Sequence, residues 1–175
     1  MSNNKDMAIQ LEAATEEDLD HLLRLQKKAF HGQALIYNDL GLPSLTQTLD
    51  DLKKEFARKA MYKVALNGKI IASIRCYAKD RTLFIEKLMV DPDLQNRGIG
   101  TKVMHALKAR YAAVVNRYEL STGHKSARNL HLYKKLGYEE IRQEPLNDNC
   151  RLIVMEKKNV QAAYPVKRAG SELPC

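Results

Sequence analysis

Cysteine is scarce in this chain, and long apolar runs are absent. The three cysteines, Cys76, Cys150 and Cys175, are odd in number and widely spaced. This pattern argues against a disulfide framework or a zinc site and favours a reducing, cytoplasmic environment. Apolar runs such as residues 70–74 are far shorter than a membrane span, and the polar start of the chain does not resemble a signal peptide. We therefore expect a cytoplasmic protein with no membrane association.

The size and composition favour one folded domain. With 175 residues and 45% hydrophobic content, the chain can bury a core but is short for two domains. Its 29 basic and 21 acidic residues give a net charge of +8, which is compatible with nucleic acid, an anionic surface or a phosphorylated small ligand. No aromatic–basic interleaving or zinc-finger spacing supports nucleic-acid binding, so we expect none. The histidines show no metal-ligand spacing, and no metal site is expected among His21, His31, His105, His124 and His131.

Hydrophobic periodicity predicts the element order β-α-α-β-β-β-α-β-α-β-β. Strands are expected at residues 8–12, 61–66, 69–77, 82–90, 118–121, 138–143 and 151–156. Helices are expected after Thr15, over residues 45–60, from Ile99 and from Ser126 to Gly137, with a loop at 31–44. An antiparallel meander followed by strand–helix–strand crossovers predicts an α+β fold with a mixed sheet. We expect one domain over residues 7–158 and a flexible tail over 159–175.

The strongest functional signal is a turn with two glycines that leads from a strand into an amphipathic helix. Gly98 and Gly100 let phosphate oxygens approach the backbone, and Arg97 adds a positive charge. The start of the helix offers unpaired N–H groups, which favour an anion. A Walker loop is absent, and Val103 stands where a dinucleotide-binding turn needs a third glycine. Taken alone, the turn indicates either an anion site or an ordinary helix start.

Three segments together resemble the GNAT (Gcn5-related) acetyltransferase superfamily. The hexapeptide Gln95-Asn96-Arg97-Gly98-Ile99-Gly100 is similar to the family's Gln/Arg-x-x-Gly-x-Gly/Ala motif. Residues 85–92 resemble its fourth strand and the following loop, and residues 129–138 resemble its second cofactor motif. The resemblance covers residues 8–157 and implies the GNAT fold, with a mixed, mostly antiparallel sheet flanked by about four helices.

The resemblance implies that acetyl-CoA lies in a V-shaped opening between the fourth and fifth strands. The residues it implies for cofactor binding are Leu88, Met89, Val90, Gln95, Asn96, Arg97, Gly98, Ile99, Gly100, Thr101, Asn129 and Tyr133. Backbone groups of residues 88–90 would bind the pantetheine arm and the acetyl carbonyl, and the glycine turn would bind the pyrophosphate. Asn129 and Tyr133 stand four apart on one helical face and would reach the pantetheine arm and the sulfur. Tyr133 would be the general acid for the departing thiolate, while N–H groups near Met89 would stabilise the oxyanion.

The general base and the acceptor site are less well defined. Glu86 shares strand parity with Leu88 and Val90, and some GNAT members use a glutamate on this strand as the base. Other members let solvent take the proton, and a surface ion pair with a lysine is an equally good interpretation of Glu86. Tyr37 and Asp39 lie in the expected loop at 31–44, a region that commonly shapes the acceptor pocket in this fold. They are candidates to bind a cationic amine, although a solvated loop with a packed tyrosine fits as well.

The resemblance therefore implies an N-acetyltransferase that moves the acetyl group of acetyl-CoA to a primary amine of a small molecule or protein. An intact Tyr133 and an uninterrupted glycine turn argue against the main alternative, an acyl-CoA sensor with this fold but no turnover. The sequence leaves open the acceptor amine, the use of longer acyl donors and the formation of a homodimer.

Overall fold

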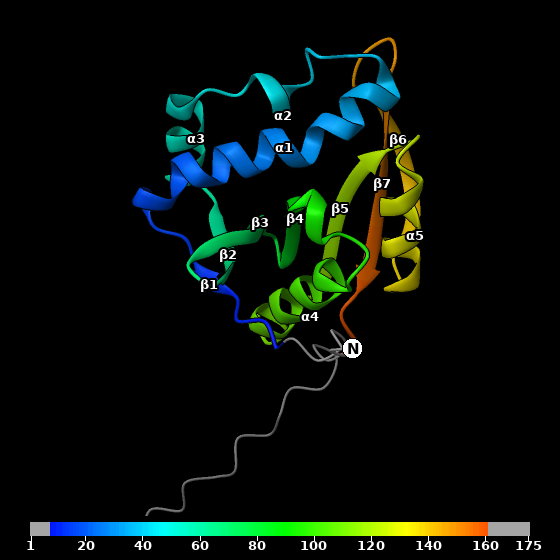
Figure 1. Ribbon diagram of the computed structural model, residues 1–175. Helices are drawn as coiled ribbons and strands as arrows, with labels where there is room; N and C mark the ends of the chain where they lie inside the picture. Colours follow the sequence, from blue (N-terminus) through cyan, green and yellow to red (C-terminus); the bar gives the residue numbers. More distant parts are fainter. Residues whose placement is uncertain (1–7, 161–175) are drawn as a thin grey trace, which may run out of the picture.

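The computed structural model describes residues 8–160, which contain a seven-stranded sheet in the order β1-β2-β3-β4-β5-β7-β6 (Figure 1). The strands are β1 (Glu12–Ala13), β2 (Ala60–Leu66), β3 (Lys69–Lys79), β4 (Thr82–Val90), β5 (Arg117–Gly123), β6 (Glu139–Pro145) and β7 (Arg151–Lys158). Every neighbouring pair is antiparallel except β4 and β5, which are parallel. The predicted mixed, mostly antiparallel α+β fold is confirmed. Most of the predicted tail, residues 161–175, lies outside the described residues.

In the described part of the chain, five α-helices cover the two faces of the sheet, one more than expected because α2 is a single separate turn. They are α1 (Leu19–Tyr37), α2 (Pro43–Thr46), α3 (Leu49–Phe56), α4 (Ile99–Tyr111) and α5 (Ala127–Lys135). Figure 1 shows α1, α2 and α3 on one face of the sheet and α4 on the other. One apolar cluster joins α4 and α5 to the sheet through residues such as Val103 and Tyr133. A smaller one joins α1 and α3 through Leu22 and Leu52.

The expected loop at residues 31–44 is wrong in its first half, because α1 continues to Tyr37. Gly32 weakens a helix by about 1 kcal/mol relative to alanine, but it lies on the exposed side of α1. Ala34 and Tyr37 are 0% and 3% exposed, so burial of this last stretch offsets the weak local propensity. The helix then ends at Asn38, whose φ of 50° is left-handed.

The single helix expected over residues 45–60 is divided into α2 and α3. Gln47, between them, has an extended ψ of 131°. Thr48 begins the second helix, since its hydroxyl oxygen accepts a hydrogen bond from the Asp51 amide at 3.2 Å. The capping by Thr48 thus outweighed the spacing of apolar residues that predicted one continuous helix.

The other sequence-based expectations hold closely. Strand β4 has the predicted bounds, and the predicted turn Asn67-Gly68 has φ values of 50° and 76°, as a tight hairpin requires. Gly137 ends α5 with a φ of 84°. The first strand differs, because β1 is only Glu12–Ala13, and Glu12 is the one residue of the predicted 8–12 segment that pairs with β2.

Strand β4 contains a β-bulge at Glu86 and Lys87. Arg75 of β3 pairs with Glu86, but Ser73, two residues before Arg75, pairs with Met89 rather than Leu88. Lys87 carries the irregularity, with a φ of 46°. Glu86 therefore shares a face of the sheet with Met89, and the predicted common parity of Glu86 with Leu88 and Val90 is wrong.

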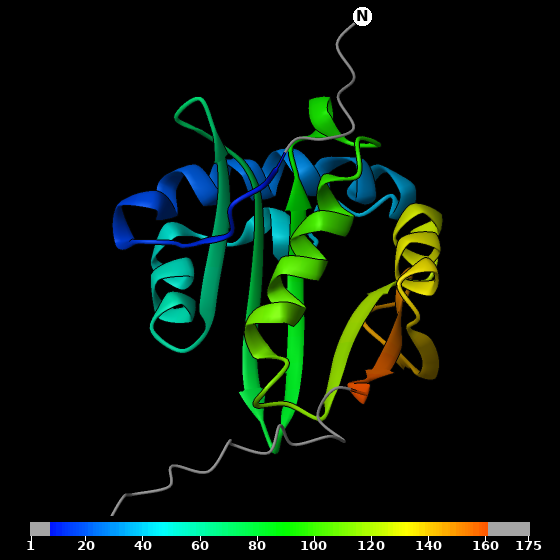
Figure 2. The same cartoon turned by 90° about the horizontal axis from the view of Figure 1, so that it is seen from below.

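The parallel pairing of β4 with β5 stops halfway along both strands. The last paired residues are Ile85 and Leu120, and the ends of both strands continue beyond them without pairing to each other. Figure 2 shows the two strands adjacent at one end and splayed apart at the other, where α1 crosses behind them. We call this opening the split.

Candidate functional site

The glycine turn forms the start of α4 beside the split. Gly98 is the N-cap residue, with a φ of 77° that an L side chain rarely adopts. The first bond of α4 runs from the Lys102 amide to the Gly98 carbonyl at 3.1 Å. The amides of residues 99–101 precede that bond and are not used within the helix, so they form the positive end of its dipole.

A cavity of about 430 Å³ adjoins this turn, and we call it the turn cavity. Its lining residues are Leu88, Val90, Leu94, Gln95, Asn96, Gly98, Ile99, Gly100, Thr101, Arg128, Asn129, His131, Leu132 and Lys135. A Cβ atom at Gly100 would stand 3.6 to 3.9 Å from side-chain atoms of Leu132, Leu88 and Val90. A larger side chain at Gly100 would therefore fill the cavity.

The basic side chains of the turn cavity come mainly from α5. Arg128 and Lys135 line the cavity, whereas the predicted phosphate ligand Arg97 is exposed and is not among the lining residues. Arg128 donates a hydrogen bond to the Gln95 side chain, which in turn donates to the Val90 carbonyl at 3.1 Å. Arg128 and Lys135 were not predicted to belong to the site, although their seven-residue spacing places them on one helical face.

Backbone polar groups at the end of β4 also face the split. The Asp91 amide donates to Ile71 of β3 at 2.8 Å. Because backbone groups alternate along a strand, those of Met89 point the same way as those of Asp91. The backbone groups of Leu88 and Val90 point the opposite way, toward β5. The backbone of residues 88–90 was predicted to bind the cofactor, and within this segment Leu88 and Val90 face the split.

A second cavity of about 380 Å³ lies on the α1 side of the split, and we call it the network cavity. It is lined by the ends of β4 and β5, by α1, α3 and α5, and by the β6–β7 connection, through residues that include Phe30, Glu55, Lys59, Glu86, Lys87, Thr122, Tyr133 and Cys150. Leu88 and Asn129 line both cavities. The two cavities therefore meet at the split.

Tyr133 and Asn129 stand where the cavities meet. Tyr133 lines the network cavity with only 6% of its surface exposed, and burial raises the pKa of its hydroxyl to about 12. The phenol therefore keeps its proton at neutral pH and is able to donate it. Asn129 donates a hydrogen bond to the Thr122 hydroxyl at 3.3 Å, which links α5 to the free end of β5.

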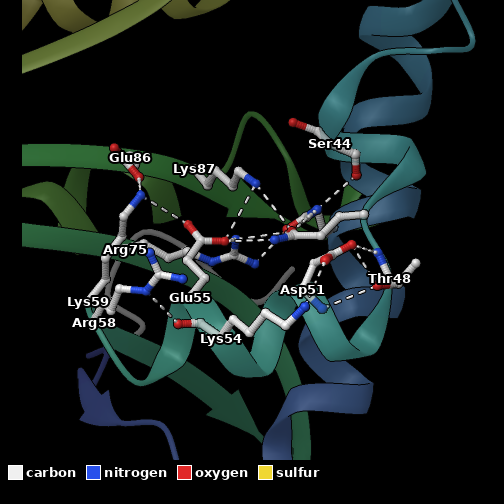
Figure 3. A network of polar contacts seen from close by, with 12 residues as sticks. Ser44, Thr48, Asp51, Lys54, Glu55, Arg58, Lys59, Arg75, Glu86 and Lys87 are labelled. Carbon is white, nitrogen blue, oxygen red and sulfur yellow. Dashed lines mark hydrogen bonds and ion pairs between the residues drawn. The ribbon is translucent and has the colours of Figure 1, made fainter.

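Glu86 belongs to a polar network beneath the network cavity (Figure 3). It forms an ion pair with Lys59, which also contacts Glu55 at 3.2 Å. Glu55 binds the fully buried Arg75 at 2.8 Å. Burial acts to raise the pKa of Glu55, but Arg75, Gln47 and the two nearby lysines outweigh it, and the net shift is downward. Glu86 was predicted from the sequence, whereas Lys59, Arg75 and Lys87 were not, because they lie far apart in the chain or carry no motif.

The two acceptor candidates are placed differently. Tyr37 lines the network cavity, and its hydroxyl accepts a hydrogen bond from the Lys125 amide at 2.7 Å. Asp39 is not a lining residue, because its carboxylate accepts hydrogen bonds from the Gly41 amide and the Asn147 side chain, both at 2.8 Å. The ring of His124 contacts that of Tyr37 at a tilt of 51°, with centroids 5.5 Å apart, and His124 lies outside both cavities.

The residues 8–160 offer neither a metal site nor a membrane span. Within that range, no cluster of three or more His, Cys, Asp or Glu side chains is arranged to hold a metal ion. In the same part of the chain, no helix combines the length and apolar character needed to cross a membrane.

Comparison with known sequences points to one family. The model of the acetyltransferase (GNAT) family matches residues 19–138, which is more than half of the chain. An uncharacterised N-acetyltransferase of Methanocaldococcus jannaschii is 28% identical over 148 residues, covering 72% of this chain and 58% of that protein. The chain thus spans little more than half the length of that relative.

Solved acetyltransferase structures share the fold. The ribosomal-protein-S18-alanine N-acetyltransferase of Escherichia coli matches with a TM-score of 0.69 at 19% identity, covering 96% of this chain and 100% of that one. The PaiA N-acetyltransferase of Thermoplasma acidophilum, in complex with coenzyme A, matches with a TM-score of 0.61 at 17% identity, covering 87% and 99%. A probable acetyltransferase of Staphylococcus epidermidis gives 0.71 at 10% identity, covering 86% and 99%. At these identities the likeness establishes the fold alone.

Proposed function

Because the chain belongs to the acetyltransferase (GNAT) family, we propose that it transfers the acetyl group of acetyl-CoA to a primary amine. The observation that carries the proposal is the junction of two cavities at the split, where Leu88 and Asn129 line both. One cavity has a helix start and basic side chains, which suit a phosphorylated donor. The other has a buried acid and a carboxylate, which suit an amine acceptor. A reaction that joins the two substrates fits a site where the cavities meet.

The turn cavity fits the donor. The unused amides at the start of α4 and the side chains of Arg128 and Lys135 would hold the pyrophosphate, since both favour a multiply charged anion. The backbone groups of Leu88 and the Val90 amide, which β5 leaves unpaired, would bind the amide-containing pantetheine arm. The Thermoplasma protein was solved with coenzyme A, and its shared fold supports this choice of donor.

Tyr133 is the proposed general acid. Acetyl-CoA supplies a thioester, whose carbonyl carbon bonds to the amine nitrogen while the carbon–sulfur bond breaks and the sulfur departs as a thiolate. The Tyr133 hydroxyl donates its proton to that sulfur, and the amine gives up one proton in exchange, so the products are an amide and a thiol. A phenol with a pKa of about 12 donates readily only to a group whose charge is developing, which restricts the transfer to the reacting complex.

Glu86 is the proposed acceptor of the amine's proton, directly or through water. It lines the network cavity, and its ion pair with Lys59 holds it in place. It lies opposite Arg75 of β3, on the same face of the sheet. Tyr37 closes the far side of the same cavity and is proposed to contact the acceptor. Solvent is the alternative base. We also propose that the enzyme is cytoplasmic.

The experiment that tests the proposal combines two measurements on the full chain. Acetyl-CoA should raise the thermal midpoint, because a ligand that binds only the folded state stabilises it. Release of free thiol should then be followed with acetyl-CoA and a panel of amines and peptides. Stabilisation together with amine-dependent thiol release supports the enzyme. Stabilisation without thiol release in the presence of any amine would instead support the acyl-CoA sensor. The absence of both stabilisation and thiol release would overturn the enzyme and the sensor alike.

A further inference from the structure

Two consecutive residues of opposite charge line the network cavity. Glu86 and Lys87 follow each other in β4, and neighbouring side chains in a regular strand point to opposite faces. The bulge removes that alternation, and both side chains reach the same cavity. Lys87 has a φ of 46° there, a strained conformation for a lysine. The chain thus maintains an unfavourable backbone conformation at the position that presents an ammonium group to the cavity.

Lys87 has few partners for its three N–H donors. Within residues 8–160 its one hydrogen bond goes to the Gln47 side-chain oxygen at 3.2 Å, which also accepts from Gln26 at 2.8 Å. The nearest carboxylate oxygen, on Glu55, is 3.9 Å away and lies closer to Arg75, at 2.8 Å. The ammonium group of Lys87 therefore shares these acceptors with donors that lie closer to them.

The charges of the network do not balance. Three cations, Lys59, Arg75 and Lys87, face two carboxylates, Glu55 and Glu86, so the cluster carries one excess positive charge. Lys87 is the least compensated of the three cations, because its nearest carboxylate oxygen is 3.9 Å away, whereas Lys59 and Arg75 each have one within 3.2 Å. Burial and the neighbouring Arg75 also lower the pKa of Lys87. An anion beside Lys87 would restore neutrality in a partly buried site, where an unpaired charge is costly.

We propose that the acceptor is an amine that also carries a carboxylate, with the carboxylate bound by Lys87 and the amine beside Glu86. This inference rests on the proposed function, because it names the substrate class of the same cavity. A polyamine would place a second cation against Lys59 and Lys87. A small amino acid instead carries a carboxylate and an amine close together. These two groups complement Lys87 and Glu86, which are neighbours at the bulge.

The test compares matched substrates and matched variants. A panel of α-, β-, γ- and ω-amino acids is measured beside the corresponding carboxamides, which keep the amine but lose the anionic charge. The ratio of kcat/KM for each acid to that for its amide should exceed about tenfold for at least one pair, as a charge-assisted hydrogen bond provides. In Lys87→Gln the ratio should fall toward one, and Lys87→Arg should retain part of it. Lys54→Gln removes an equal charge from an exposed position on α3 and should leave the ratio unchanged.

Binding of the same pairs to the coenzyme A-loaded protein, measured by calorimetry, separates the two claims. Carboxylate-dependent binding that Lys87→Gln abolishes supports the inference even if no amine is acetylated, which would overturn only the proposed function. Acetylation of the amides as efficiently as the acids would leave the function in place and overturn the inference. The inference is also overturned if no amino acid binds or reacts, or if Lys54→Gln lowers the ratio as much as Lys87→Gln does.

Discussion

The ring of Tyr37 packs directly on the backbone of Gly123, where a Cβ atom would stand 2.8 Å from the tyrosine Cζ atom. This contact joins the end of α1 to the free end of β5. It closes the network cavity opposite β4, since both residues are among its lining. A glycine is needed at this position because no side chain fits between the strand and the ring.

Gly123→Ala should therefore displace Tyr37 and destabilise the fold by about 1 to 3 kcal/mol, the usual cost of an overpacked contact. The free energy of unfolding in urea measures this loss. A Tyr37→Leu background removes the obstructing ring, so the alanine should cost less there. Gly32→Ala, on the open side of α1 where a Cβ atom meets nothing within 4 Å, should instead stabilise by about 0.5 to 1 kcal/mol. Equal effects of the two alanines would contradict the packing described.

Tyr133→Phe should lower kcat by about 100- to 10,000-fold while acetyl-CoA affinity stays within about threefold, because only the proton donor is removed. Calorimetry and steady-state kinetics give the two numbers. A proton donor works below its pKa, and that of Tyr133 is about 12, so its ionisation should produce no fall in activity up to pH 10.

Tyr138→Phe is the matched control for Tyr133→Phe. The Tyr138 hydroxyl is buried and has no hydrogen-bond partner among residues 8–160, and it lies outside both cavities, although its ring contacts Tyr133. Its removal should leave kcat nearly unchanged. If both phenylalanine variants lost turnover equally, packing rather than proton donation would explain the loss.

Lys135→Gln should weaken coenzyme A binding about three- to tenfold, since it removes one exposed charge from the turn cavity. Lys134→Gln, the adjacent position outside the cavity, should change the affinity less than about twofold. Calorimetric titration at two salt concentrations checks both, and the difference between the variants should shrink at high salt. Equal effects would mean that general attraction, not a contact in the cavity, holds the phosphates.

Asp91 should make stability depend on pH in the acid range. It lies at the end of β4, is 2% exposed and binds Lys28 of α1 at 2.7 Å. Burial acts to raise its pKa, but Lys28 and Lys69 outweigh this effect and lower it from 3.8 to about 2. The unfolded chain therefore binds the proton more tightly, and the contribution is present above pH 4 and lost as the pH falls toward 2.

Urea denaturation at pH 7 and pH 2 should show that Asp91→Asn removes about 1 to 2 kcal/mol of this acid-sensitive stability. Asp93→Asn offers a control, because Asp93 also pairs with Lys28 but is 77% exposed. A similar loss in both variants would indicate that surface charge, not the buried Asp91, is responsible.

The sequence predicted the features that depend on local chemistry. The glycine turn, the Asn67-Gly68 hairpin and the end of α5 at Gly137 each rely on a residue whose backbone freedom marks the position. Asn129 and Tyr133 were predicted to share one helical face, because residues four apart in a helix lie on the same side. These features made it possible to predict the cofactor part of the site from the sequence.

The features that were missed depend on tertiary structure. No glycine or proline marks the bulge at Lys87, so strand periodicity assigned Glu86 to the wrong face. Gly32 suggested a loop, yet the burial of Tyr37 extends α1 through it. The basic residues beside the glycine turn come from α5 rather than from Arg97, because the split brings that helix against the turn. In each case a contact between distant segments outweighed the local pattern.

The most direct test of the account is thiol release from acetyl-CoA in the presence of the best amine, compared between the wild-type chain and Gly100→Val. The added side chain would extend toward Leu88, Val90 and Leu132 and fill the turn cavity at the split. We predict amine-dependent release by the wild type and a loss of at least about 100-fold in kcat/KM in a variant that still folds. Equal release by both proteins, or none by the wild type with any amine, would contradict the assignment of the split as the site of acetyl transfer.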